Sequence, residues 1–186
     1  MPNNKIILGL VGEIASGKDT VAKYLKEKHG FQTIKFSTPI RKILDALNLP
    51  QSRENMVWVG INVRNRFGEN IFGNVIAKEC ENSTANLIVL PNVRFKPDIA
   101  YLKQMNNFYL IHISSEPQIR YQRLIHRNQN SDDQTKTWEE FINDGELPTE
   151  ITIREVAKIA KHTIKNNGTL DQLHQQIDQL MDKIKK

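Results

Sequence analysis

Cysteine is scarce in this sequence, and a long apolar run is missing. Cys80 is the single cysteine among 186 residues, so no internal disulfide can form, which fits a reducing compartment. No apolar stretch approaches the roughly 20 residues of a membrane-spanning helix. Residues 1–5 lead directly into an apolar segment and contain no signal-peptide pattern. We therefore expect a cytoplasmic protein with no membrane partner.

Internal repeats, low-complexity linkers and a metal-binding pattern are absent as well. The histidines have no ligand-like spacing with one another or with Cys80, which argues against a structural zinc site. His112 lies in an apolar segment, where a core histidine is expected. With 186 residues and 39% hydrophobic content, the chain can bury one good core but is too short for two ordinary domains.

A glycine-rich turn follows the first apolar segment. Residues 5–11 form an apolar run and a helix-forming segment begins near residue 20, which predicts a strand, a loop and a helix. Gly12, Gly17 and Lys18 have the spacing Gly-x4-Gly-Lys. Glycine lets a chain wrap closely around an anion with its backbone N–H groups pointing inward. We therefore predict a phosphate-binding loop, with contacts from Gly12, Ala15, Ser16, Gly17, Lys18, Asp19 and Thr20.

The helix that opens at Gly17 strengthens this prediction. Its first N–H groups and its dipole favour an anion, and Lys18 adds a point charge for the β- and γ-phosphates. The Ser or Thr that usually follows this lysine and holds Mg2+ is replaced by Asp19. Because a carboxylate is a good ligand for a hard cation, we expect Asp19 to contact the metal directly or through water, with Thr20 as the alternative.

Strand-like and helix-like segments alternate along the rest of the chain. Further strands are expected at 31–36, 85–90, 108–113 and 162–165. Helices are expected at 21–29, 40–47, 71–81, 98–104, about 117–127, 138–143, 152–160 and 169–186. Residues 51–64 are mixed, and the polar segment 128–136 predicts a mobile loop. The alternation predicts a parallel sheet covered on both faces, with ligands at the carboxyl ends of its strands.

Two groups of arginines could supply cations opposite the loop. Arg120, Arg123 and Arg127 are three and four residues apart, so they share one helix face. That face is either a solvated surface or the base of a lid that stabilises charge on a transferred phosphoryl group. The second group is Arg53, Arg64 and Arg66, interleaved with Trp58 and Phe67.

Guanidinium groups in this second cluster suit a terminal phosphate, and its aromatic rings suit a base. Scattered arginines are common in loops, and Arg64 is the favoured candidate. Arg94, four residues past the expected third strand, should lie at the ligand edge of the sheet. That strand should also end in a carboxylate that orients Mg2+, but it ends in Pro91 and Asn92, and no acidic residue occurs before Asp98.

On the basis of these residues, the chain resembles the P-loop nucleoside and deoxynucleoside monophosphate kinases, in the branch that is also similar to dephospho-CoA kinase. The resemblance covers nearly the whole chain. Its most specific piece is residues 12–20, because Ser-Gly-Lys-Asp-Thr occurs in some of these kinases. Further pieces agree in order along the chain, at Phe36 to Arg41, Gly60 and Arg64, Phe67 and Gly68, Val93 and Arg94, Arg123 and Arg127, and Ile164 to Gly168.

The resemblance implies a single P-loop kinase domain over residues 1–186, with a substrate-binding insertion at about 51–82 and a lid at about 120–150. The implied fold is α/β: a three-layer α/β/α P-loop NTPase fold with a five-stranded parallel sheet and a helical lid. ATP with Mg2+ would be the donor. The implied roles are catalysis by Lys18, Arg123 and Arg127, acceptor binding by Ser37, Arg41, Arg64 and Arg94, and packing against the base of ATP by Asn166 or Asn167.

We expect phosphoryl transfer to a small-molecule nucleotide, a nucleoside or deoxynucleoside monophosphate. Where the family has Asp-Gly-x-Arg, this chain has Pro91-Asn92-Val93-Arg94, which leaves full, slow and lost turnover open. Dephospho-CoA kinase is an alternative, although its hydroxyl acceptor benefits from a carboxylate base and this chain has Ser37-Thr38.

A third reading is a nucleotide-binding module that has lost catalysis. The net charge of +5 suits nucleotides as well as nucleic acid, and nucleic acid is the less expected partner. The sequence leaves the oligomeric state open.

Overall fold

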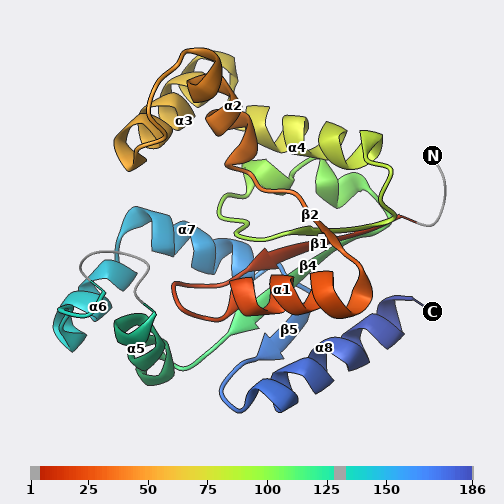
Figure 1. Ribbon diagram of the computed structural model, residues 1–186, viewed down its shortest axis with the longest axis vertical. Helices are drawn as coiled ribbons and strands as arrows, with labels where there is room; N and C mark the ends of the chain where they lie inside the picture. The colour runs from red at the N-terminus through yellow and green to blue at the C-terminus, as the bar shows by residue number, and fades with distance from the viewer. Residues whose placement is uncertain (1–4, 128–132, 186) are drawn as a thin grey trace.

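A parallel β-sheet forms the centre of the molecule in the computed structural model, which describes residues 5–127 and 133–185 (Figure 1). Within these residues the sheet has five strands in the order β2-β3-β1-β4-β5. The strands are β1 (Ile6–Val11), β2 (Gln32–Thr33), β3 (Leu87–Leu90), β4 (Phe108–Ser114) and β5 (His162–Lys165). The middle strand, β1, pairs with β3 from Ile6 opposite Leu87 and with β4 from Ile7 opposite Phe108.

The apolar run of β1 is buried on both faces of the sheet. Ile7 and Val11 pack into the core on one face, and Leu8 and Leu10 pack into the core on the other. None of these four side chains is more than 1% exposed. This explains the run of apolar residues, because alternation is lost when a parallel strand is covered twice.

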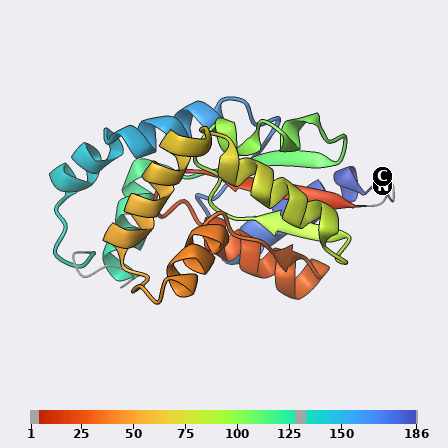
Figure 2. The same ribbon diagram turned by 90° about the horizontal axis from the view of Figure 1, so that it is seen from above.

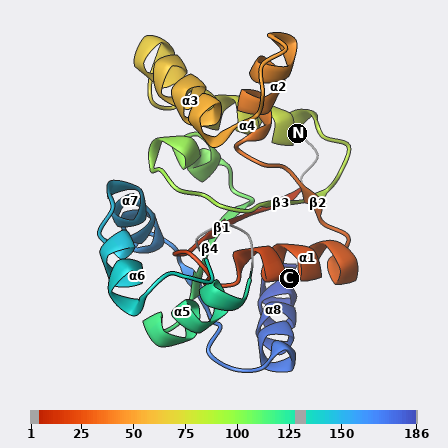
Figure 3. The same ribbon diagram turned by 60° about the vertical axis from the view of Figure 1, so that its left-hand side comes forward.

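Two layers of helices cover the sheet (Figures 2 and 3). On one face α1 (Lys18–His29) and α8 (Leu170–Ile184) enclose a core that includes Leu25 and Ile177. On the other face the core includes residues from α4 (Ile71–Asn82), α7 (Pro148–Ala157) and two short 3-10 helices, η1 (Pro97–Ile99) and η2 (Leu102–Gln104). The predicted three-layer α/β/α architecture with a five-stranded parallel sheet is confirmed.

The remaining helices lie beyond the carboxyl ends of the strands in two groups (Figure 1). One group is α2 (Thr38–Ala46) with α3 (Arg53–Phe67), and the other is α5 (Pro117–His126) with α6 (Trp138–Gly145). Both groups therefore stand on the side of the sheet where the predicted phosphate-binding loop leaves β1.

Several expected elements differ in extent from the observed ones. Residues 51–64 form most of a continuous helix, α3, which Ser52 caps by accepting a hydrogen bond from the Asn55 amide. The segment 98–104 is divided into η1 and η2 instead of one helix. Helix α7 starts at Pro148, four residues before the expected start, because proline is well suited to the first turn.

Strand β2 is shorter than predicted, because only Gln32 and Thr33 pair with β3. In the predicted mobile loop 128–136, residues 128–132 lie outside the described part of the chain. Among the described helices, none combines the length and the apolar character that a membrane crossing requires. Cys80 is fully buried on α4, as expected of a small core residue, and burial raises the pKa of its thiol to about 12.

Lys5 closes the carboxyl end of α4. Its ammonium group is buried and donates hydrogen bonds to the carbonyl oxygens of Cys80 at 2.8 Å, Glu81 at 3.0 Å and Ser83 at 2.8 Å. The last carbonyls of a helix have no partner within the helix. A cation at this end also interacts favourably with the helix dipole, so Lys5 joins the start of β1 to the helix that covers it.

We expect Lys5→Met to lower the free energy of unfolding by about 2 kcal/mol, because it leaves these carbonyls without their charged donor. Lys23→Met is the matched control, because the Lys23 side chain is 73% exposed on α1. The control should stay within about 0.5 kcal/mol of the parent. Urea denaturation followed by circular dichroism measures both, and equal stabilities would show that the Lys5 contacts contribute nothing.

Candidate functional site

The loop between β1 and α1 has the backbone that a phosphate cradle requires. Gly17 precedes α1 with a φ of 98°, and Ala15 also has a positive φ of 58°. A β-carbon at Gly12 would come within 2.3 Å of the carbonyl oxygen of Ile113, and one at Gly17 within 2.2 Å of the side-chain amide of Asn166. Both glycines are therefore favoured by the close approach of the loop to Ile113 and Asn166, whereas the sequence predicted glycine here for contact with an anion.

Lys18 folds back over this loop from the first turn of α1. Its ammonium group donates a hydrogen bond to the carbonyl oxygen of Glu13 at 2.9 Å. Burial lowers the pKa of Lys18 to about 8, while the charges of Asp19 and Glu150 oppose the shift and the charge of Arg94 adds to it. The lysine is thus held at the loop, with both carboxylates and a further cation close by.

Asn166 supports the loop from the end of β5. Its buried side chain donates a hydrogen bond to the carbonyl oxygen of Ser16 at 2.9 Å and accepts one from Arg123 at 3.4 Å. Asn167 instead joins the start of α5, because it exchanges two hydrogen bonds of 3.0 Å with Glu116. The structure brings Asn166 to the loop as a supporting residue, and a contact of either asparagine with a base stays a prediction.

The predicted metal ligands lie in the first turn of α1. Asp19 and Thr20 are exposed beside Lys18. Within residues 5–127 and 133–185, no three acidic, histidine or cysteine side chains lie together so that they could hold a metal ion. Mg2+ bound with a nucleotide takes only one or two protein carboxylates, with phosphate oxygens and water as its other ligands. The residues present fit that kind of cation, bound together with phosphates.

Arg120 and Arg123 of α5 and Arg127, which follows its last residue, have different surroundings. Arg123 lies near the loop, where it contacts Asn166 and donates a hydrogen bond to the Ser115 hydroxyl at 3.2 Å. Arg127 forms two hydrogen bonds of 2.9 and 3.0 Å with the buried carboxylate of Asp133. The described contacts of Arg127 are thus made within the α5–α6 region and do not reach the loop.

Arg120 is the arginine of α5 that contacts the loop directly. It donates a hydrogen bond to the carbonyl oxygen of Ile14 at 3.3 Å and pairs with the Glu13 carboxylate at 3.3 Å. Burial lowers the pKa of Arg120, and the charge of Glu13 opposes the shift. Sequence reasoning placed this residue on the correct face but favoured its two neighbours.

Three residues at the loop were missed from the sequence. Glu13 lies inside the motif and pairs with Arg154 of α7 at 3.5 Å. Glu150, also on α7, accepts a weak hydrogen bond of 3.4 Å from the Ile14 amide. Arg154 and Glu150 carry no local signal, because they approach the loop only through the packing of α7 on the sheet.

The acceptor-side arginines are separated in the structure. Arg64 forms a 2.8 Å ion pair with Asp98, and its guanidinium lies about 5 Å from the rings of Phe72 and Phe95. Asp98 is only 3% exposed, and burial raises the pKa of its carboxyl although Arg64 opposes the shift. The buried Asp98 carboxylate therefore holds Arg64 in the last turn of α3.

The other expected acceptor residues have more open positions. Ser37 precedes α2 without a capping hydrogen bond from its side chain, and Arg41 contacts the side chain of Gln51. Arg94 is exposed, and its charge acts on Lys18. The structure brings Arg94 towards the loop, whereas Arg41 lies on α2, in the group formed by α2 and α3.

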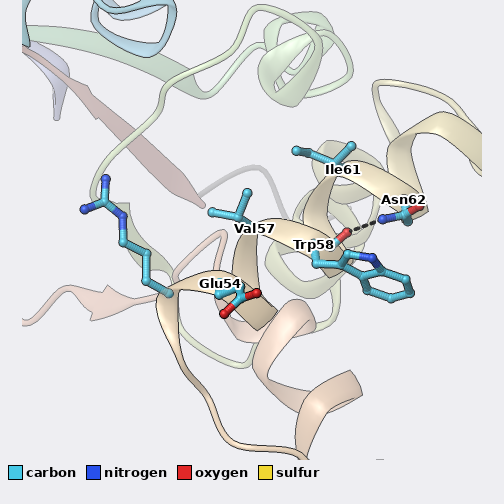
Figure 4. A pocket seen from close by; sticks show the side chains of 6 residues that line it. Glu54, Val57, Trp58, Ile61 and Asn62 are labelled. Atoms are coloured by element: carbon cyan, nitrogen blue, oxygen red, sulfur yellow. Dashed lines mark hydrogen bonds between the residues drawn. The ribbon is translucent and has the colours of Figure 1, made fainter.

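Helix α3 borders a hollow of about 690 Å3, shown in Figure 4. The exposed fractions of Val57, Trp58 and Ile61 are 52%, 64% and 52%. Arg53, Glu54 and Asn62 complete the lining, and the Asn62 side chain donates a hydrogen bond to the Trp58 carbonyl oxygen. Trp58 is thus available to a ligand.

The end of β3 lies beside the loop, where the missing carboxylate would have been. Asn92 has a φ of 64°, a left-handed conformation that asparagine tolerates better than most residues. The next amide, of Val93, donates a hydrogen bond to the carbonyl oxygen of Leu10 at 2.9 Å. The turn therefore stays joined to β1, and it presents an amide side chain at this position.

Comparisons with known proteins agree with this fold. No family model matches the chain. It is 26% identical over 184 residues to a UPF0200 protein of Pyrococcus horikoshii, covering 96% of this chain and 97% of that protein. Shikimate kinase from Bacteroides thetaiotaomicron is similar with a TM-score of 0.63 at 14% identity, over 97% of this chain and 99% of that chain. Dephospho-CoA kinase from Campylobacter jejuni is similar with a TM-score of 0.59 at 19% identity, over 96% of both chains.

These similarities show that the chain shares the α/β fold of these kinases. They cover nearly the full length of each protein, so the arrangement of sheet and helices is shared as a whole. At sequence identities of 14% and 19%, the substrates in the names of these two kinases are those of the named proteins and say nothing about the substrate of this chain.

We expect Arg64→Met to lower the free energy of unfolding by about 3 kcal/mol, because it leaves the buried Asp98 carboxylate without its partner. Arg94→Met should change it by less than about 0.5 kcal/mol, because Arg94 is exposed. Urea denaturation of both variants measures the difference. A stable Arg64→Met variant would contradict the structural role of the pair.

If ATP binds at this loop, we expect the complex to take up a proton at about pH 8.5 and none through Lys18 at about pH 6.5, because nearby phosphate charge raises the pKa of an ammonium group. In the free protein the pKa of Lys18 is about 8, so the group is largely neutral at the higher pH and charged at the lower one. Titration calorimetry in two buffers of different ionisation enthalpy measures the uptake. Lys18→Arg, which stays charged, should abolish it.

Proposed function

We propose that this protein transfers a phosphoryl group from ATP, with Mg2+, to a nucleoside or deoxynucleoside monophosphate in the cytoplasm. Residues 1–186 would act as one P-loop kinase domain, with the acceptor-binding insertion at about 51–82 and the lid at about 120–150. The observation that carries the proposal is the loop between β1 and α1. Its glycines let the backbone turn tightly before the N-terminus of α1, and Lys18 folds back over the same loop, an arrangement that suits a chain of phosphates.

On the donor side, Lys18 and the loop amides would hold the β- and γ-phosphates. Asp19, or Thr20, would hold Mg2+, which when bound would neutralise charge on the phosphates. Arg123 is supported for a role near the transferred group by its contact with Asn166, and Arg127 would act there after exchanging its contact with Asp133.

On the acceptor side, Arg94 is the favoured ligand of the acceptor phosphate, because it is exposed and acts electrostatically on Lys18. Arg64 would contribute from the base of α3, with Ser37 and Arg41 on the neighbouring helix. The hollow beside Trp58 has an aromatic surface for a base. Phosphoryl transfer to a phosphate oxygen needs little help from a general base, so positioning and electrostatic stabilisation can supply most of the rate enhancement.

Dephospho-CoA kinase activity is the alternative within enzymes, and the similarity of the fold to such a kinase favours it. Its acceptor is a hydroxyl group, which gains from a general base. A carboxylate is expected as that base after the second strand, but this chain has Ser37 and Thr38 there, which makes this alternative less favoured.

A nucleotide-binding module without catalysis is the candidate from another class. The amide of Asn92 in place of a carboxylate at the end of β3 favours it. Such a protein would bind ATP through the same loop without acceptor-stimulated turnover.

We expect Lys18→Ala to lower turnover by about a hundredfold or more, because it removes a charge that stabilises the transition state. Lys23→Ala, on the exposed side of the same helix, should leave turnover unchanged. A coupled assay of ADP release over a panel of monophosphates and dephospho-CoA measures the rates. An undiminished rate in Lys18→Ala would refute the assignment.

The same panel separates the candidates when it is run beside a titration of ATP binding. Release stimulated by monophosphates supports the proposal, and release stimulated only by dephospho-CoA supports the alternative kinase. ATP binding without stimulated release supports the binding module, and salt-sensitive retention of RNA would strengthen that reading.

A further inference from the structure

Glu13 contacts three cations at the loop. Its backbone carbonyl oxygen accepts a hydrogen bond from Lys18 at 2.9 Å. Its carboxylate uses one oxygen for Arg120 at 3.3 Å and the other for Arg154 at 3.5 Å. One residue of the phosphate-binding motif therefore holds the loop lysine and two arginines from distant parts of the chain.

The two arginines would repel each other without an anion between them. The charge of Arg154 lowers the pKa of Arg120, whereas the charge of Glu13 raises it. Arg120 is 7% exposed and lies over the ring of Phe141 at 5.3 Å, so its position is well defined. The Glu13 carboxylate offsets this repulsion at a partly buried site, where charge is screened less than in water.

Arg154 is the more exposed of the two. Its side chain is 35% exposed, and it borders a hollow of about 330 Å3 that Glu13 and His112 also line. It pairs with Glu146 at 3.2 Å as well, a residue that lies outside the loop and whose side chain is 71% exposed. Glu146 therefore offers a matched carboxylate with the same partner and no contact with the loop.

Helix α7 presents Arg154 together with Glu150, four residues apart on one face. Glu150 accepts the hydrogen bond from the Ile14 amide, so a carboxylate oxygen already lies against a loop N–H. A phosphate oxygen can make the same kind of contact. Arg154 thus lies on the same helix face as a residue that contacts a loop N–H, and it contacts the loop itself through Glu13.

We infer that Glu13 is a positioning residue, which gathers Arg120 and Arg154 beside the loop so that they meet the charge of the phosphoryl group during transfer. The inference rests on the proposed function. Glu13 is itself an anion and would not touch the phosphates. Its effect reaches the reaction through the two arginines, which it holds near their working positions before the donor binds.

The test compares Glu13→Gln with Glu146→Gln in kcat and in the Kd for ATP. We expect Glu13→Gln to lower kcat by about tenfold, because the arginines are less well placed. Its Kd for ATP should be unchanged or lower, because a negative charge near the phosphates is removed. Glu146→Gln should keep kcat within about twofold of the parent. A higher Kd for ATP in Glu13→Gln together with an unchanged kcat would overturn the inference.

Arg154→Gln and the double variant with Glu13→Gln complete a cycle. If Glu13 acts through Arg154, the two losses in kcat overlap, and the double variant is little slower than the slower single variant. Losses that multiply would overturn the inference. The cycle also covers a Glu13→Gln variant that folds poorly, because Arg154→Gln alone should then lower kcat with Kd for ATP little changed.

A fluorescence measurement separates failure of this inference from failure of the proposed function. In a Trp58→Phe background Trp138 is the single tryptophan. The centre of its ring lies 5.6 Å from that of Phe141, and Arg120 lies over the Phe141 ring. Glu13→Gln should change Trp138 emission in the absence of nucleotide, and Glu146→Gln should not. A wild-type protein without turnover on any acceptor would refute the proposed function, whereas unchanged emission in Glu13→Gln would refute the role of Glu13.

Discussion

The site depends on the close approach of the backbone at residues 12–17 to the strands on one side of β1. Gly12 lies against the carbonyl oxygen of Ile113 on β4, and Gly17 lies against Asn166 just beyond β5. These contacts fix the curvature of the loop from the sheet outward. Any side chain at either glycine would push the loop off the sheet and turn its N–H groups away from an anion.

Much of the fold could be predicted because its signals are local. The apolar run of β1, the helix end at Gly30 with its positive φ, and the apolar face of α8 are each written in neighbouring residues. Helix α3 was missed because its residues lack a clear apolar face, with Val59 as its only fully buried residue. Its stability comes from contacts with α2 and α4, which local periodicity does not record.

The candidate site was predictable where one motif contains it and not where distant segments meet. The glycines and Lys18 were singled out by their spacing and by the apolar segment and helix start on either side of them. Arg64 was singled out from the sequence as a phosphate ligand, yet nothing near it in the sequence indicates that it pairs with Asp98, 34 residues away. Arg154 meets Glu13 across 141 residues, and an ion pair of that span leaves no periodic trace. Residue type gave the chemistry available, and tertiary packing decided which cation reaches the loop.

No carboxylate follows β3 before Asp98, and Asn92 stands at the turn that joins β3 to the loop region. Carboxylates are supplied instead by Glu13 and Asp19 at the loop and by Glu150 on α7, beside Lys18 and the two arginines. In the free protein these anions offset the gathered cations. Under the proposed function a polyphosphate would compete with them, so its affinity would reflect the difference between two sets of contacts. The cations would meanwhile stay at the loop, which would keep the reorganisation on binding small and leave them in place to meet the charge of the reacting group.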